Sequence, residues 1–183
     1  MFLRISLLLL VYACLLGASC TGPDTADYPP KILNEVQQLE TAQQKTAFLE
    51  SLHLSDQADR KKNLPSAQLL ANDKVRLQKI GAYLDTYGYP SKKQVSRAAV
   101  DAPYLVIHHA PTNEPRHQYF PLIYQAVKDG DIDPETFAFF LGRFQKIENG
   151  NWIEFGRPFT VEEEIDTLLT ALGLDTTTTT INP

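Results

Sequence analysis

Three of the four histidines in this chain lie in one stretch, YLVIHHAPTNEPRHQYF, from Tyr104 to Phe120. His108 and His109 end an apolar run, and His117 follows a polar loop. Imidazole is a frequent general base and metal ligand, so this grouping suggests a candidate site. Zinc needs three or four convergent ligands, whereas neighbouring residues on a helix point apart, and the chain has no His-Glu-x-x-His spacing. The sequence therefore predicts no metal site, and we expect no cofactor.

His109 has two interpretations. It falls four residues after Leu105, near the C-terminal end of a predicted helix, where histidine can satisfy free carbonyls and interact with the helix dipole. Alternatively, His109 is a general base oriented by Asp56 or Asp73. The sequence contains neither a Gly-x-Ser-x-Gly elbow nor a glycine-rich phosphate loop. A hydrolase of this kind would therefore have to use an activated water molecule.

Four charged residues fall on apolar faces of predicted helices: Asp56, Arg60, Asp73 and Arg143. A buried charge is costly unless it is paired. Because two acids match two arginines, we predict that the four form one network with His109 at its edge. Such a network either locks helices together or builds a ligand site, since perturbed charges also concentrate at sites.

The same residues carry a resemblance to a bacterial domain family of unknown function. That family runs Asp-Gln-x-x-Arg, Tyr-Gly-Trp-Pro, Gln-His-Ala, Asp-Arg and Tyr-Gly-Thr-Gln, and similar motifs occur here in the same order over roughly residues 31 to 157, among them DQADR, YGYP, Val95 and VIHHA. The resemblance implies a polar site at Asp56, Gln57, Arg60, Asp73, His109 and Arg143.

Several positions depart from the family pattern. Gly142 stands in place of the family's Asp, His108 in place of Gln and Tyr89 in place of Trp, and FGRP at 155–158 replaces Tyr-Gly-Thr-Gln. If the family's site is catalytic, this chain lacks part of it. The family has no established activity, so the resemblance implies relatives and not a reaction.

The N-terminus resembles a bacterial lipoprotein leader. Arg4 precedes the apolar run ISLLLLVYACLL, and small residues lead to Cys20 in LLGASC. The run is shorter than the roughly 20 residues of a membrane span and is typical of a cleaved signal peptide over residues 1–19. The resemblance implies that Cys20 is acylated, with palmitate among the expected groups, and anchors the protein in the bacterial cell envelope. The alternative is cleavage without lipid, which leaves Cys20 as a free thiol.

Composition limits the kinds of partner that we expect for this protein. Cys14 and Cys20 are the two cysteines, so the mature domain has none left for a disulfide. The net charge of −5 and the lack of a basic run exclude a nucleic-acid partner. We expect a monomer held at a membrane by its lipid, with an envelope protein or a small molecule as ligand. A binding or interaction module is favoured, and a hydrolase-like enzyme using His109 and the charged cluster is the alternative.

Apolar spacing predicts an all-α fold with a single multi-helix domain over residues 31–173. We expect a helix from 31 to about 60 and a second after Pro65 that ends at YGYP. The segment 98–107 is apolar on nearly every side, which indicates a buried helix or a buried strand, and the helix is favoured because helices surround it. Two more follow, the first ending at Gly130 and the second with Asp133 as N-cap, and TVEE is a capping box for the last. A flexible tether over 20–30, a short extended segment near 151–159 and a disordered threonine-rich tail over 174–183 complete the prediction.

Overall fold

The computed structural model describes residues 28–153 and 160–174. Within them it is 74% helical, with seven helices and no strand, which confirms the all-α prediction. The helices are α1 (Pro30–Gln37), α2 (Ala42–Lys61), α3 (Ser66–Tyr87), α4 (Arg97–His108), α5 (Glu114–Lys128), α6 (Pro134–Asn149) and α7 (Val161–Leu172). None of these helices is long and apolar enough to cross a membrane.

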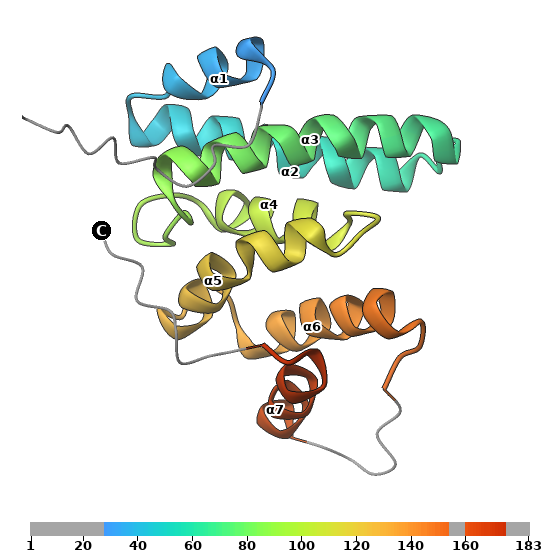
Figure 1. The fold of residues 1–183 in the computed structure, drawn as a ribbon. Helices are drawn as coiled ribbons and strands as arrows, with labels where there is room; N and C mark the ends of the chain where they lie inside the picture. The colour runs from blue at the N-terminus through green and yellow to red at the C-terminus, as the bar shows by residue number, and fades with distance from the viewer. Residues whose placement is uncertain (1–27, 154–159, 175–183) are drawn as a thin grey trace, which may run out of the picture.

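Helix α4 lies at the centre of the arrangement. The long helices α2 and α3 run side by side with α1 against α3, while α6 and α7 pair at the far end (Figure 1). α4 contacts α2, α3, α5 and α6, and it buries residues on nearly every side because its sequence, RAAVDAPYLVIH, is mostly apolar. Its C-terminal end therefore meets side chains from several other helices.

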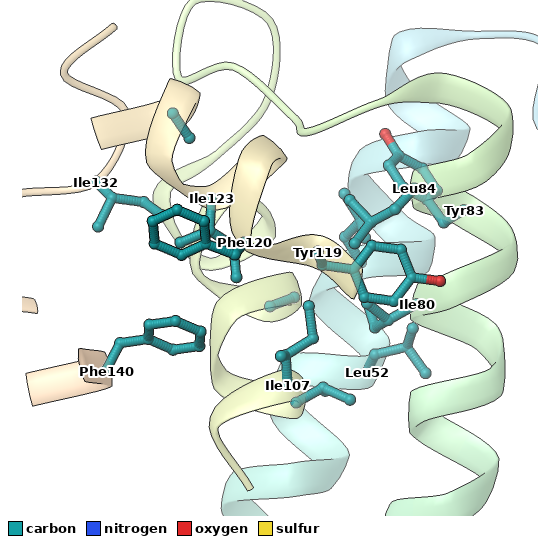
Figure 2. Close-up of a cluster of buried hydrophobic side chains, with 14 of the residues drawn as sticks. Leu52, Ile80, Tyr83, Leu84, Ile107, Tyr119, Phe120, Ile123, Ile132 and Phe140 are labelled. Atoms are coloured by element: carbon teal, nitrogen blue, oxygen red, sulfur yellow. The ribbon is translucent and has the colours of Figure 1, made fainter. Parts of the chain in front are cut away.

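One apolar core joins these helices. Leu52 of α2, Ile80 of α3, Ile107 of α4 and Tyr119 of α5 converge, and Phe140 of α6 approaches from the other side (Figure 2). Each is at most 5% exposed. Burying one such side chain contributes about 1.5–3 kcal/mol, so this contact among five helices is a main source of stability for the described part of the chain.

The predicted helix from 31 to 60 is wrong in one respect, because the chain makes two helices there. α1 ends at Gln37, and α2 starts after Thr41. The Thr41 hydroxyl accepts a hydrogen bond from the Gln44 backbone N–H, and the Gln44 side chain accepts one from the Thr41 backbone N–H. This reciprocal capping box begins a new helix and redirects the chain.

The predicted caps at the C-terminal end of the domain are confirmed. Asp133 accepts from the backbone N–H of Thr136 at the start of α6, and α6 ends at Gly150 in the left-handed conformation. Thr160 and Glu163 form the predicted capping box of α7. The residues predicted to be extended lie partly, and those of the threonine tail mostly, outside the described part of the chain.

The packed domain begins earlier than the predicted boundary at residue 31. The Tyr28 hydroxyl donates to Asp85 Oδ2 at 2.6 Å and lies 2.8 Å from the Tyr119 hydroxyl. Gly81 makes room for this contact, because a Cβ atom there would lie 2.6 Å from the Tyr28 oxygen. The end of the predicted tether is therefore fixed against α3 and α5.

Candidate functional site: a polar cluster between α2, α3 and α4

Three of the four charged residues expected to meet do so. Asp56 of α2 is fully buried, and its Oδ1 accepts a hydrogen bond from Arg60 Nη2 at 3.0 Å. The same Nη2 lies 3.0 Å from Asp73 Oδ1 on α3. Gln57 lies beside them and donates to Asp56 Oδ2 at 3.0 Å. One arginine thus joins the facing surfaces of α2 and α3.

A second arginine, absent from the sequence prediction, completes the cluster. Arg76 Nη2 lies 2.7 Å from Asp73 Oδ1, and Nη1 lies 2.7 Å from Asp59 Oδ2, which also accepts from Asn72. The Arg76 side chain is only 6% exposed. The sequence could have predicted this pair, because Arg76 follows Asp73 by one helical turn, a spacing at which opposite charges pair. We call Asp56, Asp59, Arg60, Asp73 and Arg76 the polar cluster.

Ion pairing outweighs desolvation in this cluster. Burial alone would raise the pKa of Asp56, but His109 and Arg60 lower it below its usual value. Burial alone would lower the pKa of Arg76, but Asp59 and Asp73 raise it. Both groups therefore stay charged near neutral pH, and most of the cluster holds α2 and α3 together.

The prediction for Arg143 is wrong. Its Nε donates to the backbone carbonyl of His108 at 2.9 Å, and no carboxylate among the described residues lies within ion-pair distance of it. The physical reason is the position of α6, which packs on α4, α5 and α7 but not on α2 or α3. Helical spacing showed which face Arg143 occupies, but not which helix that face meets.

Arg116 of α5 was also missed by sequence reasoning. It is 0% exposed and has no carboxylate partner among the described residues. Its Nη1 donates to the Thr112 carbonyl and the Asn113 side chain, and its Nη2 to the carbonyls of His108 and Ala110. Burial, with the nearby charge of Arg143, lowers the pKa of Arg116 to about 10. Arg116 therefore caps the C-terminal end of α4.

His109 contacts the cluster through one nitrogen. Its Nδ1 lies 2.9 Å from Arg60 Nε and 3.0 Å from Asp56 Oδ1. It therefore meets side chains of α2, whereas the capping interpretation had it satisfy carbonyls of its own helix. An arginine Nε–H is always a donor, so Nδ1 either accepts from Arg60 or carries a proton that it donates to Asp56. The first state leaves the ring proton on Nε2, and the second leaves Nε2 with a lone pair.

His108 lies deeper than its neighbour. It is 4% exposed, its ring stacks on Phe139 with centroids 4.6 Å apart, and its Nδ1 has no hydrogen-bond partner among the described residues. Burial lowers the pKa of His108 to about 3, and the nearby charges of Arg143 and Arg116 act in the same direction. His108 is therefore a neutral packing residue at pH 7.

We expect this histidine to make the protein sensitive to acid. In the unfolded chain it titrates near pH 6.5, and in the folded protein near pH 3, so between these values the unfolded state binds more protons and stability falls as the pH falls. Between about pH 7 and pH 5 the loss should be about 2 kcal/mol, because one pKa unit corresponds to about 1.4 kcal/mol. Urea unfolding at both values measures it.

The variant His108→Leu should lack this loss, while Phe139→Leu, which disturbs the same stack without removing the imidazole, should keep it. Asp56 does not contribute to the loss between pH 7 and pH 5. Its pKa is lowered in the folded protein, so its contribution to stability decreases only below its unfolded pKa near 4. An equal loss in wild type and His108→Leu would show that other groups cause the acid sensitivity.

The surface of the cluster lies where α4 ends. There His109 and Arg60 have side chains 19% and 27% exposed, Phe139 is 59% exposed, and Arg143 is half-buried. We call these four residues the open edge. His117 is not part of it, because its ring packs on Phe144 and it lies 3.7 Å from Glu148. The described residues contain no group of His, Cys, Asp and Glu that could hold a metal ion.

In comparisons with known proteins, no family model, curated protein or solved structure matches this chain. The resemblance to a domain family of unknown function thus stays a prediction. The function must be inferred from the geometry of the polar cluster and its open edge.

Proposed function

We propose that the protein is a lipid-anchored binding module of the bacterial cell envelope, and that its open edge binds an acidic ligand through His109, Arg60 and Arg143. The observation that carries this proposal is the 2.9 Å contact between Arg60 Nε and His109 Nδ1. In the state in which Nδ1 accepts from Arg60, the ring proton lies on Nε2. His109 then offers a donor, not a base, to whatever reaches the edge.

Arg143 adds further donors at the same edge. Its Nε is held by the His108 carbonyl, which leaves its two Nη groups without a hydrogen bond to the described residues. Carboxylates and phosphates are the groups that such a set of donors recognises best. Phe139 provides an exposed apolar surface beside them. An acidic ligand with an apolar portion would match both features.

Titration with citrate and with inorganic phosphate tests this proposal. We expect saturable binding that Arg143→Gln weakens by about tenfold, because a hydrogen bond to a charged group contributes about 1.5–3 kcal/mol. Arg97→Gln is the matched control, since Arg97 is an exposed arginine paired with Asp101 and Asp133 away from the edge. Equal weakening by both variants would mean that the anions respond to overall charge and that the edge is not a site.

A second candidate is a hydrolase-like enzyme that activates water with His109. One observation favours it: the fully buried carboxylate of Asp56 lies 3.0 Å from His109 Nδ1. If Nδ1–H donates to Asp56, Nε2 keeps a lone pair and can accept a proton from water. Nitrogen-15 NMR of labelled histidine separates the two functions, because a proton on Nε2 supports binding and a proton on Nδ1 supports catalysis.

The anchor part of the proposal rests on the leader sequence, since Cys20 lies outside the described residues. We expect the wild-type protein to partition with membranes when expressed in bacteria, and Cys20→Ser to appear in the soluble fraction. The physical reason is that two or more acyl chains hold a protein stably on a bilayer. Cys14→Ser is the control and should still partition with membranes. Membrane association of Cys20→Ser would contradict lipid anchoring at this residue.

A further inference from the structure

A recess lies at the ends of α2 and α3 that are opposite to the polar cluster. It has a volume of about 340 Å³ and is lined mainly by Lys45 of α2, Tyr83 and Tyr87 of α3, and Tyr89, Gln94 and Val95 of the following loop. Ligand pockets start at about 300 Å³, so the recess suits a small molecule. Tyr87, Tyr89 and Pro90 of the YGYP motif line it, and none of them belongs to the polar cluster.

The tyrosine rings of this recess are held rigidly. The Tyr87 hydroxyl lies 2.9 Å from the carbonyl of Val36 and 3.1 Å from that of Leu39, and the Tyr89 hydroxyl donates to the carbonyl of Val100 at 2.9 Å. Tyr83 packs on Tyr87 with ring centroids 5.2 Å apart. Because these hydroxyls are engaged with the backbone, Tyr87 and Tyr89 offer the recess their apolar ring atoms.

Lys45 brings a cation to this aromatic wall. Its ammonium nitrogen lies 3.7 Å from the centroid of the Tyr87 ring, a cation–π contact. No ion pair or hydrogen bond joins this nitrogen to any residue that the structure describes. Its three N–H donors are thus open to a ligand. No acidic side chain lines the recess, which therefore favours an anion over a cation.

We propose that this recess binds a small organic acid with a flat apolar body. The carboxylate would pair with the Lys45 ammonium, the apolar body would lie against Tyr83 and Tyr87, and the Gln94 amide would add a hydrogen bond at the rim. Such a site does not depend on the proposed function, because it shares no residue with the open edge. The protein would then hold two separate sites for acidic ligands, at opposite ends of the α2–α3 pair.

Phenylacetate is a suitable probe, because it combines a carboxylate with one aromatic ring, and phenylacetamide is its neutral counterpart. Binding is followed in proton–nitrogen NMR spectra of the intact protein. We expect phenylacetate to shift the signals of Lys45, Tyr87 and Gln94 in a saturable way, and phenylacetamide to bind about tenfold more weakly.

Lys45→Met should weaken phenylacetate binding to the level of the amide while keeping the aliphatic stem on the Tyr87 ring. Lys93→Met, which removes an exposed lysine outside the recess, is the control and should leave binding unchanged. Arg143→Gln should also leave it unchanged, which separates this site from the open edge. Equal binding of acid and amide, shifts confined to residues outside the recess, or no saturation would each overturn the proposal.

Discussion

Replacing Arg76 with methionine should lower the free energy of unfolding by about 3–5 kcal/mol, the cost of breaking a buried ion pair on one side. Arg76 pairs with Asp59 and Asp73 at 2.7 Å, and its side chain is 6% exposed. Without it, Arg60 is the one arginine left among three carboxylates of the polar cluster. Urea unfolding at pH 7 measures the difference from wild type.

Arg97→Met is the matched control for this prediction. Arg97 also pairs with two carboxylates, those of Asp101 and Asp133 at 2.9 and 3.0 Å, but its side chain is 56% exposed. Exposed pairs contribute about 0–1 kcal/mol, so the control should change stability by no more than this. If Arg76→Met lowers the free energy of unfolding no more than Arg97→Met does, burial does not strengthen the ion pairs of the polar cluster. The cluster would then have no structural role.

A double-mutant cycle shows whether the cluster acts as a unit. Because Arg76 and Asp73 are in contact, Arg76→Met and Asp73→Asn should couple by about 0.5–3 kcal/mol instead of adding. Arg60→Met should be milder than Arg76→Met, since its side chain is 27% exposed and water can solvate the acids it leaves. If the effects of Arg60→Met, Asp73→Asn and Arg76→Met on the free energy of unfolding add up in the combined variants, the three residues do not share one network.

Replacing Arg116 with methionine should be comparably severe, with a loss of about 3–5 kcal/mol. The guanidinium donates to three backbone carbonyls and the Asn113 side chain, and leaving a buried acceptor without a partner costs about 1–3 kcal/mol. Removing a buried cation offsets part of this loss. The loss of stability should therefore be smaller than the summed cost of leaving all four acceptors without a partner. Unfolding by urea at neutral pH provides the measurement.

Two further variants show how Arg116 acts. Arg116→Lys keeps the charge but cannot reach several carbonyls with a planar fork, so it should recover little of the lost stability. Arg143→Gln loses one hydrogen bond to the His108 carbonyl and should cost about 1 kcal/mol. Recovery of wild-type stability by Arg116→Lys would show that charge next to the helix end matters, and not the hydrogen-bond geometry.

These stability effects help to assign roles within the site. Asp56, Asp73 and Arg76 are at least nine-tenths buried and hold α2 and α3 together, whereas His109, Arg60 and Arg143 reach the surface at the open edge. Variants of the first group should affect folding, and Arg143→Gln should affect binding with little loss of stability. The proposed function therefore depends on the outer residues, with the inner ones as their support.

The sequence by itself determined the fold class and most helix boundaries. Apolar residues at helical spacing, the N-cap Asp133 and the capping box at Thr160 act within a few residues of one another, so their effect does not depend on the rest of the fold. It also predicted that Asp56, Arg60 and Asp73 would meet, because charges on buried faces need partners. The break at Thr41 was equally local, since its capping box can be read from the sequence, but it was overlooked.

Tertiary structure decided which partner each charge received. Arg60 and Arg143 both lie on helix faces with apolar neighbours, yet only Arg60 reaches the acids, because α2 faces α3 while α6 packs on the end of α4. The role of Arg116 could not be predicted from the sequence, because its acceptors are backbone carbonyls, which every residue possesses. Helical periodicity specifies the direction of a side chain around its own axis. The crossing of helices far apart in sequence then determines what that side chain meets.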